Sequence, residues 1–114
     1  MAYDEDLADR IRVELRDMSD VSEQRMFGGL AFLVQGNMAI AASGQGGLLV
    51  RAGEEQGDKL IASGAAEPME MRGRQMSGWL RVDADRVRTK RELVRWIRIG
   101  TSIARSLPAK RKKS

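Results

Sequence analysis

Eight cationic side chains near the end of the chain have the types and spacing that best fit a binding site. They are Arg91, Arg95, Arg98, Arg105, Lys110, Arg111, Lys112 and Lys113. At 100° per residue the four arginines fall on one side of a helix, and apolar residues fall on the other side. Guanidinium groups in such a row can pair with phosphates along a nucleic acid or with carboxylates of a protein.

The distribution of charge along the whole chain singles out the same segment. Residues 1–85 carry nine Lys and Arg against fifteen Asp and Glu, a net −6, whereas residues 86–114 carry eleven against one, a net +10. Such asymmetry indicates a nucleic-acid or acidic partner, or attraction between two parts of one fold. Four interpretations stay open: a protein contact, a nucleic-acid contact, a solvated helix face with a tail that aids solubility, and pairing with acidic groups of residues 1–85.

Side chains suited to catalysis are few. The chain has no cysteine and no histidine, which removes thiolate nucleophiles, the commonest metal ligands and the best proton carrier near neutrality. Ser43 has no histidine to activate it, and Lys59 has no partner nearby in the sequence. Asp83 and Asp85 follow a strand-like run and fit a turn that enters a helix. We predict no catalytic residue, no cofactor and no metal site.

The glycine-rich segment SGQGG, residues 43–47, fits a turn better than a phosphate-binding loop. A phosphate loop needs its glycines between a strand and the first turn of a helix, where free N–H groups point at the anion. Here the segment lies between two strand-like runs, because LLVRA follows it. Gly28 and Gly29 fall inside a predicted strand, where glycine indicates a bulge or a close backbone crossing.

The size of the chain, 114 residues and 12.7 kDa, fits one domain with one core. We assign this domain to residues 1–108 and expect residues 109–114, AKRKKS, to be a mobile basic tail. No run approaches the roughly 18 apolar residues that span a bilayer, and the first ten residues are acidic, unlike a secretory signal. We expect a cytoplasmic protein without a membrane partner.

The elements that position these side chains begin with a helix over about 3–18, where Leu7, Ile11, Leu15 and Met18 recur at spacings of four, four and three. A meander of three strands is predicted next, over about 25–34, 38–42 and 48–52, with turns at 35–37 and 43–47.

The alternation in these strands predicts which side chains face the core. Met38, Ile40 and Ala42 are expected on one face of the second strand, and Leu48 and Val50 share a face of the third.

The second half of the chain predicts a short helix, further strand and a long final helix. Residues 53–64 fit a helix with Leu60 and Ile61 inward and Gly64 after its end. An extended segment, a turn over RGRQMSG and a strand over about 78–82 follow. TKRE, residues 89–92, fits a capping box that begins the final helix, and Pro108 follows its end.

The last strand carries a tryptophan with two interpretations. Leu80 and Val82 are expected to face the core, with Trp79 and Arg81 on the opposite side. Trp79 either packs under a helix, which is the favoured interpretation, or stacks beside an arginine.

Several segments together resemble the N-terminal domain of TfoX/Sxy proteins, a family named for a regulator of natural competence. They are RMFGG, GNM, GGLLVR, PMEMRGRQMSGWLRV and W…ARSLP, and the similarity runs from about Ser22 to Pro108. The resemblance implies an α+β domain with a regulatory role in DNA uptake or in transcription that depends on the cyclic-AMP receptor, exercised through protein contacts. The named regulators continue into a second, helical domain, so we expect a stand-alone N-terminal domain here.

The combined expectation is a single α+β domain in which an antiparallel sheet packs with N- and C-terminal helices. We expect a non-enzymatic regulatory or interaction module that contacts a protein, with the transcription machinery as one partner class. The alternatives are nucleic-acid binding by the arginine face and basic tail, and a small enzyme of unknown reaction. Exposed strand edges would also allow a homodimer.

Overall fold

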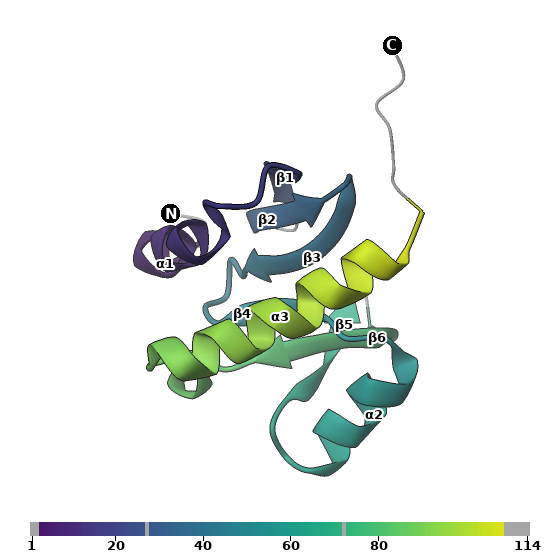
Figure 1. Cartoon of the computed structure of the whole chain (residues 1–114). Coiled ribbons are helices and arrows are strands. Elements are labelled where there is room, and N and C mark those ends of the chain that lie inside the picture. The colour runs from purple at the N-terminus through teal and green to yellow at the C-terminus, as the bar shows by residue number, and fades with distance from the viewer. Residues whose placement is uncertain (1–2, 27, 72, 109–114) are drawn as a thin grey trace.

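One antiparallel sheet and three α-helices make up the computed structural model, which describes residues 3–26, 28–71 and 73–108 (Figure 1). The elements in chain order are α1 (Glu5–Leu15), β1 (Val21–Met26), β2 (Gly29–Val34), β3 (Asn37–Ala42), β4 (Leu48–Arg51), α2 (Glu54–Ala62), β5 (Glu67–Met71), β6 (Arg74–Val82), the 3₁₀ turn η1 (Ala84–Arg86) and α3 (Lys90–Ser106). The strand order is β1-β2-β3-β4-β6-β5, so β1 and β5 are the edges. The α+β architecture is as predicted.

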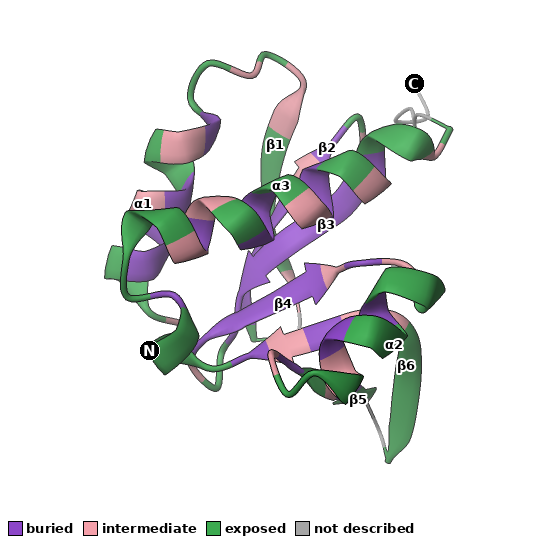
Figure 2. Cartoon of the chain, turned by 60° about the horizontal axis from the view of Figure 1, so that its bottom comes forward, coloured by how far each residue is buried: buried purple, intermediate pink, exposed green. Residues whose placement is uncertain are grey.

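The helices cover one face of the sheet, and the main core lies between them. Alternate residues of β2, β3, β4 and β6 face the buried sides of α1, α2 and α3, as the burial colours of Figure 2 show. Leu80 and Val82 face this core as predicted, and so do Leu48 and Val50. Burying these side chains removes apolar surface from water, which is the main favourable term in folding.

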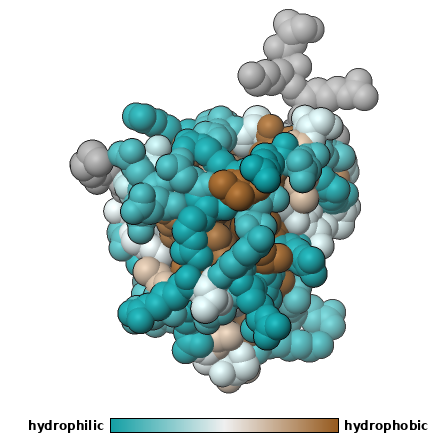
Figure 3. All heavy atoms as spheres, turned by 60° about the vertical axis from the view of Figure 1, so that its left-hand side comes forward, coloured by the Kyte–Doolittle hydropathy of each residue, from teal (hydrophilic) through white to brown (hydrophobic). Residues whose placement is uncertain are grey.

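A second, smaller apolar cluster lies on the opposite face of the sheet and is made of strand residues. Its buried members are Ala31, Met38, Ala41, Leu49 and Met69, with Met26, Leu33 and Trp79 half-buried beside them. The described part of the chain has two large apolar side chains that are exposed, Val13 and Met76. The face of the molecule in Figure 3 shows apolar areas surrounded by hydrophilic side chains.

The start of the sheet differs from the prediction in its number of strands. VSEQRM, expected to be mostly connection, forms the edge strand β1, and the meander β1 to β4 has four strands. Because both sides of β1 are largely solvated, its sequence lacks the apolar alternation that reveals a strand. Gly28 has a positive φ of 74° in the β1–β2 connection, whereas Gly29 makes the predicted close crossing, against the Ala42 carbonyl oxygen.

The predicted common face of β3 is wrong for Met38. Ile40 pairs with Phe32 but Met38 pairs with Leu33, so β3 has one residue more than β2 over this step. This irregularity turns Met38 to the opposite face, into the second cluster.

The predicted bounds also change at α1 and at β6. Asp4 accepts a hydrogen bond from the Leu7 N–H at 3.1 Å and begins α1, which ends at Leu15, so Met18 packs on the core from beyond the helix. β6 begins at Arg74, within the segment predicted as a turn, and pairs with β5 as a hairpin. The α2 prediction is confirmed, since Leu60 is buried, Ile61 is half-buried and Gly64 follows with a φ of 80°.

Two contacts hold α3 against β3. A Cβ at Gly100 would overlap the Ala39 carbonyl oxygen, so the absence of a side chain lets the two backbones approach. At the end of the helix the buried Asn37 Nδ2 donates to the carbonyl oxygens of Ala104 at 3.3 Å and Pro108 at 2.9 Å. The predicted capping box of Thr89 and Glu92 begins α3. The orientation of α3, and of everything on its outer face, is therefore fixed at both ends and in the middle.

Candidate functional site

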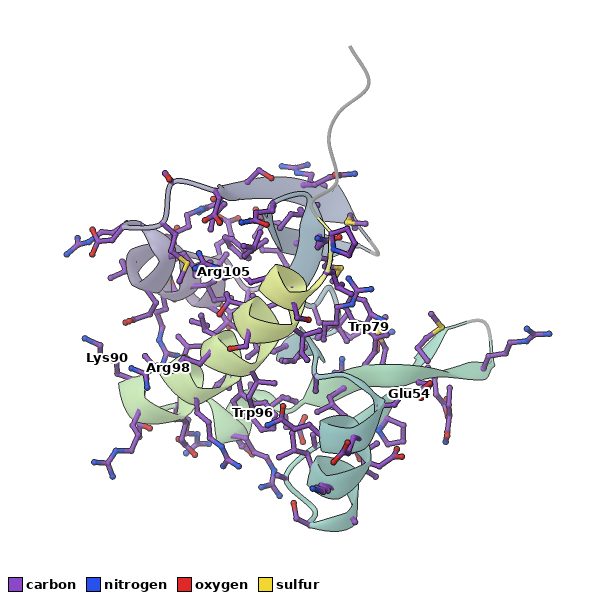
Figure 4. All side chains as sticks on the ribbon, turned by 45° about the vertical axis from the view of Figure 1, so that its right-hand side comes forward. Glu54, Trp79, Lys90, Trp96, Arg98 and Arg105 are labelled. Carbon is purple, nitrogen blue, oxygen red and sulfur yellow. The ribbon has the colours of Figure 1, made fainter. Side chains whose placement is uncertain are left out.

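The four arginines predicted on the final helix lie together on the outer face of α3. Arg91, Arg95, Arg98 and Arg105 are all exposed, and the opposite side of the helix is buried in the core. Figure 4 shows Arg98 and Arg105 along α3, with Lys90 at its start. The remaining predicted binding residues, Lys110, Arg111, Lys112 and Lys113, lie outside the described residues.

Ion pairs neutralise the two ends of this face. Arg105 Nη2 lies 3.0 Å from Asp20 Oδ1, and Lys90 Nζ lies 3.9 Å from Glu14 Oε2. Within the described residues Arg91, Arg95 and Arg98 form no ion pair. The first half of α3 therefore carries three cations whose charge no ion pair of the described residues neutralises.

An open hollow of about 690 Å³ lies over this part of α3. Its lining residues are Gln56, Lys90, Arg91, Val94, Arg95, Arg98 and Ile99. Val94 and Ile99 are half-buried and supply apolar surface between the basic side chains. The Arg95 guanidinium lies 5.6 Å from the ring centroid of its neighbour Trp96. The hollow thus combines positive charge with an apolar area, a composition that suits a protein surface better than a bare phosphate backbone.

A second hollow of about 450 Å³ shares Gln56 with the first. Its other lining residues are Ala52, Gly53, Glu54, Glu55, Lys59 and Ile103. Glu54 accepts a hydrogen bond from the Ser77 hydroxyl at 2.9 Å, and Glu55 lies 3.6 Å from Lys59 Nζ. With two carboxylates against one ammonium, this hollow carries the opposite sign of charge from its neighbour.

The side chains considered for catalysis are used in local structure. Ser43 is buried, and its hydroxyl accepts from the Gln45 N–H at 3.1 Å and from Arg81 Nη1 at 3.2 Å, which fixes the β3–β4 turn. Asp85 pairs with Arg88 at 2.7 Å. The turn predicted at Asp83 and Asp85 is present as η1, but the Asp83 side chain makes no capping hydrogen bond. Lys59 is exposed on α2.

Trp79 is not packed under a helix, which corrects the favoured prediction. Like Arg81, it lies on the sheet face opposite the helices, in the second apolar cluster. The Arg51 guanidinium lies over its ring, 5.1 Å from the centroid, so the stacking alternative describes it. The two tryptophans consequently face different sides of the sheet, since Trp96 is in the main core.

The residues that complete the hollows beside α3 were not predicted from the sequence. Val94 and Ile99 flank the core stripe, and Gln56, Glu54 and Glu55 come from α2, more than thirty positions earlier in the chain. The amphipathic pattern of α3 could have flagged Val94 and Ile99, which are apolar residues on its polar side. The contribution of α2 depends on tertiary packing and has no local signal.

Comparison with known proteins identifies a family for most of the chain. The family model of the TfoX N-terminal domain matches residues 14–104. No curated protein and no solved structure matches the chain. The TfoX N-terminal domain is not a known enzyme family. Among the described helices, none has the length and apolar content needed to cross a membrane, and those same residues include no cluster of potential metal ligands.

Proposed function

The chain belongs to the TfoX N-terminal domain family, and on this premise we propose that it is a regulatory module of the cytoplasm that binds another protein through the arginine face of α3. The observation that carries the proposal is the set of three exposed arginines, Arg91, Arg95 and Arg98, without a carboxylate partner in the described chain. Arg105 and the basic residues Lys110 to Lys113 extend the same surface in the sequence.

A protein partner accounts for more of this surface than a nucleic acid does. Val94 and Ile99 line the same hollow as the arginines, and apolar area of this kind contributes to affinity only when a partner covers it. Glu54 and Glu55 lie in the adjoining hollow, where they would repel phosphates. The transcription machinery is the first partner class to test, because the resemblance to TfoX/Sxy proteins implies it.

The second candidate function is nucleic-acid binding by the same cations. It is favoured by the row of guanidinium groups, which match phosphates as well as carboxylates. Its affinity would fall steeply with salt, with a slope set by the number of phosphates contacted.

The test is capture of partners from native lysate by three forms of the tagged protein, each with and without nuclease. The forms are wild type, R91E/R95E/R98E, and the control R16E/R74E/R86E, which changes the net charge equally at exposed arginines elsewhere. We expect a defined set of proteins that resists nuclease, persists in the control and falls at least about tenfold in the α3 variant. Capture that vanishes with nuclease, or that the α3 variant retains, would contradict the proposal.

A further inference from the structure

The sign of the charge changes along the outer surface shared by α3 and α2. At the start of α3 the first hollow contains the cations Lys90, Arg91, Arg95 and Arg98. The second hollow adjoins the first at Gln56 and is also lined by Ile103 of α3. Its charged residues are the carboxylates of Glu54 and Glu55 and the ammonium of Lys59. In Figure 4, Lys90 and Arg98 lie on one side of the view and Glu54 on the other. A ligand that spans both hollows must itself change sign along its length.

The spacing of the cations indicates the shape of such a ligand. Along α3 the rise of about 1.5 Å per residue places Arg91, Arg95 and Arg98 about 6 Å and then about 4.5 Å apart. Carboxylates at positions i, i+4 and i+7 of a facing helix have the same spacing, whereas alternate residues of a strand are separated by about 6.8 Å at each step. A helix also places apolar residues on a row beside its carboxylates, where they can cover Val94, Ile99 and Ile103.

We infer that the partner presents an amphipathic helix that is acidic in one half and basic at the other end, and that this helix lies along α3. Its carboxylates pair with Arg91, Arg95 and Arg98, and its basic end lies at Glu54 and Glu55. The inference rests on the proposed function and adds to it the chemistry of the partner. A nucleic acid is disfavoured as the occupant, because its charge has one sign throughout and half of the surface would repel it.

The probe is a synthetic labelled peptide of about four helical turns, with glutamates at i, i+4 and i+7, leucines beside them and two lysines at the end. Binding is followed by fluorescence anisotropy, and helix formation by circular dichroism. A second peptide replaces the terminal lysines with glutamates, and a third has the first peptide's composition in scrambled order. The proteins are wild type, R91E/R95E/R98E and E54K/E55K, each checked for cooperative unfolding and for a wild-type circular dichroism spectrum.

The expected results are reciprocal. Wild type binds the first peptide at least about tenfold tighter than the scrambled one, and R91E/R95E/R98E loses that binding. E54K/E55K binds the first peptide several-fold more weakly than wild type and prefers the second peptide. No binding, equal binding of the scrambled peptide, no change of preference in E54K/E55K, or equal competition by duplex DNA would each overturn the inference.

The failure of this inference differs from the failure of the proposed function. In one outcome R91E/R95E/R98E loses the captured proteins, whereas E54K/E55K retains them and its peptide preference is unchanged. The proposed arginine contact then stands, but the partner helix with one acidic and one basic end is wrong. If R91E/R95E/R98E retains the captured proteins, the proposed function itself is wrong.

Discussion

Two helices of this fold carry arginines on their outer faces, and the surroundings of those arginines differ. On α1, Arg12 donates to both carboxylate oxygens of Glu23, at 2.7 and 2.9 Å, and to Asp9 at 2.6 Å. The hydrogen bond from Arg12 lowers the pKa of Glu23, and the bonds to Glu23 and Asp9 raise the pKa of Arg12. On α3, by contrast, Arg91, Arg95 and Arg98 have no such carboxylates within the described chain.

The difference shows how the fold distributes its acidic residues. The excess of carboxylates in residues 1–85 is large enough to neutralise α3, yet the described ion pairs reach only its ends, through Asp20 and Glu14. Attraction within the fold therefore explains Arg105 and Lys90 but leaves Arg91, Arg95 and Arg98 without an ion pair in the described chain. Arg12 is thus held by carboxylates of its own fold, whereas Arg91, Arg95 and Arg98 are exposed and have no ion pair among the described residues.

The largest predicted loss of stability comes from a substitution that disrupts the close contact between α3 and β3. In Gly100→Ala the new Cβ overlaps the Ala39 carbonyl oxygen, so α3 or β3 must move. We expect a loss of about 3 kcal/mol or more in the free energy of unfolding, measured by urea titration. The control Gly57→Ala adds a Cβ whose nearest neighbours lie at 3.7 Å, and helix propensity there favours alanine by up to about 1 kcal/mol. Equal effects of the two substitutions would contradict the close approach of α3 and β3.

A smaller loss is expected at the end of α3. Asn37→Ala removes the donor that satisfies the carbonyl oxygens of Ala104 and Pro108, and the site is buried. We expect a loss of about 2 kcal/mol by urea titration. The control Ser106→Ala removes an exposed hydroxyl that bonds to Ile103 in the same turn, and should change the stability by less than about 0.5 kcal/mol. A neutral Asn37→Ala would show that the end of α3 is held by other contacts.

The sequence predicted the elements whose pattern is local. The period of α3, its capping box and its two faces follow from residues 89–107 alone. The core positions of α1 and α2 likewise follow from the residues of those helices. The outward position of the four arginines, which are all exposed, follows from the same local period. The part that failed depends on neighbours: β1 is a polar edge strand, and Met38 changes face because of an extra residue in β3 relative to β2.

The change in the sign of charge between the two hollows also depends on neighbouring elements. Glu54 and Glu55 complement the predicted arginines only because α2 and α3 pack on the same sheet face. Likewise Arg105 and Arg98 both lie on the polar side of the helix pattern. Arg105 is paired because Asp20 lies beside it in the fold, which the sequence of the helix does not indicate. Charge patterns along one helix thus indicate a surface but not its neutralised parts.

A modest effect of pH should separate α1 from α3. Because the pKa of Glu23 is lower in the folded state, its pair with Arg12 stabilises the protein above the unfolded-state pKa, and this contribution is lost as the pH falls through the folded-state pKa. The side chains of Arg12 and Glu23 are 41% and 39% exposed. Solvent screening therefore limits the contribution of the pair to the free energy of unfolding to about 0.5 kcal/mol. Glu23→Gln should remove this part of the acid dependence in urea midpoints, whereas Arg98→Gln should leave it unchanged. An identical acid dependence in all three proteins would contradict the assignment to Glu23.

An effect of similar size but opposite sign tests the comparison most directly. Arg95 lies four residues after Arg91 and three before Arg98, so like charges adjoin it on both sides of the helix surface. Arg91 is also in the first turn, where the helix dipole disfavours a cation. R91Q/R98Q removes these repulsions and leaves the contact of Arg95 with Trp96, so we expect a gain of about 0.5 kcal/mol at low salt that vanishes near 1 M salt.

The control R91K/R98K keeps both charges and should show little of that gain. A loss of stability in R91Q/R98Q, screened by salt, would mean that α3 has acidic partners within the chain after all, as Arg12 has. A gain would mean that the sequence retains these arginines at a cost in stability, which is expected of residues kept for binding and not for folding.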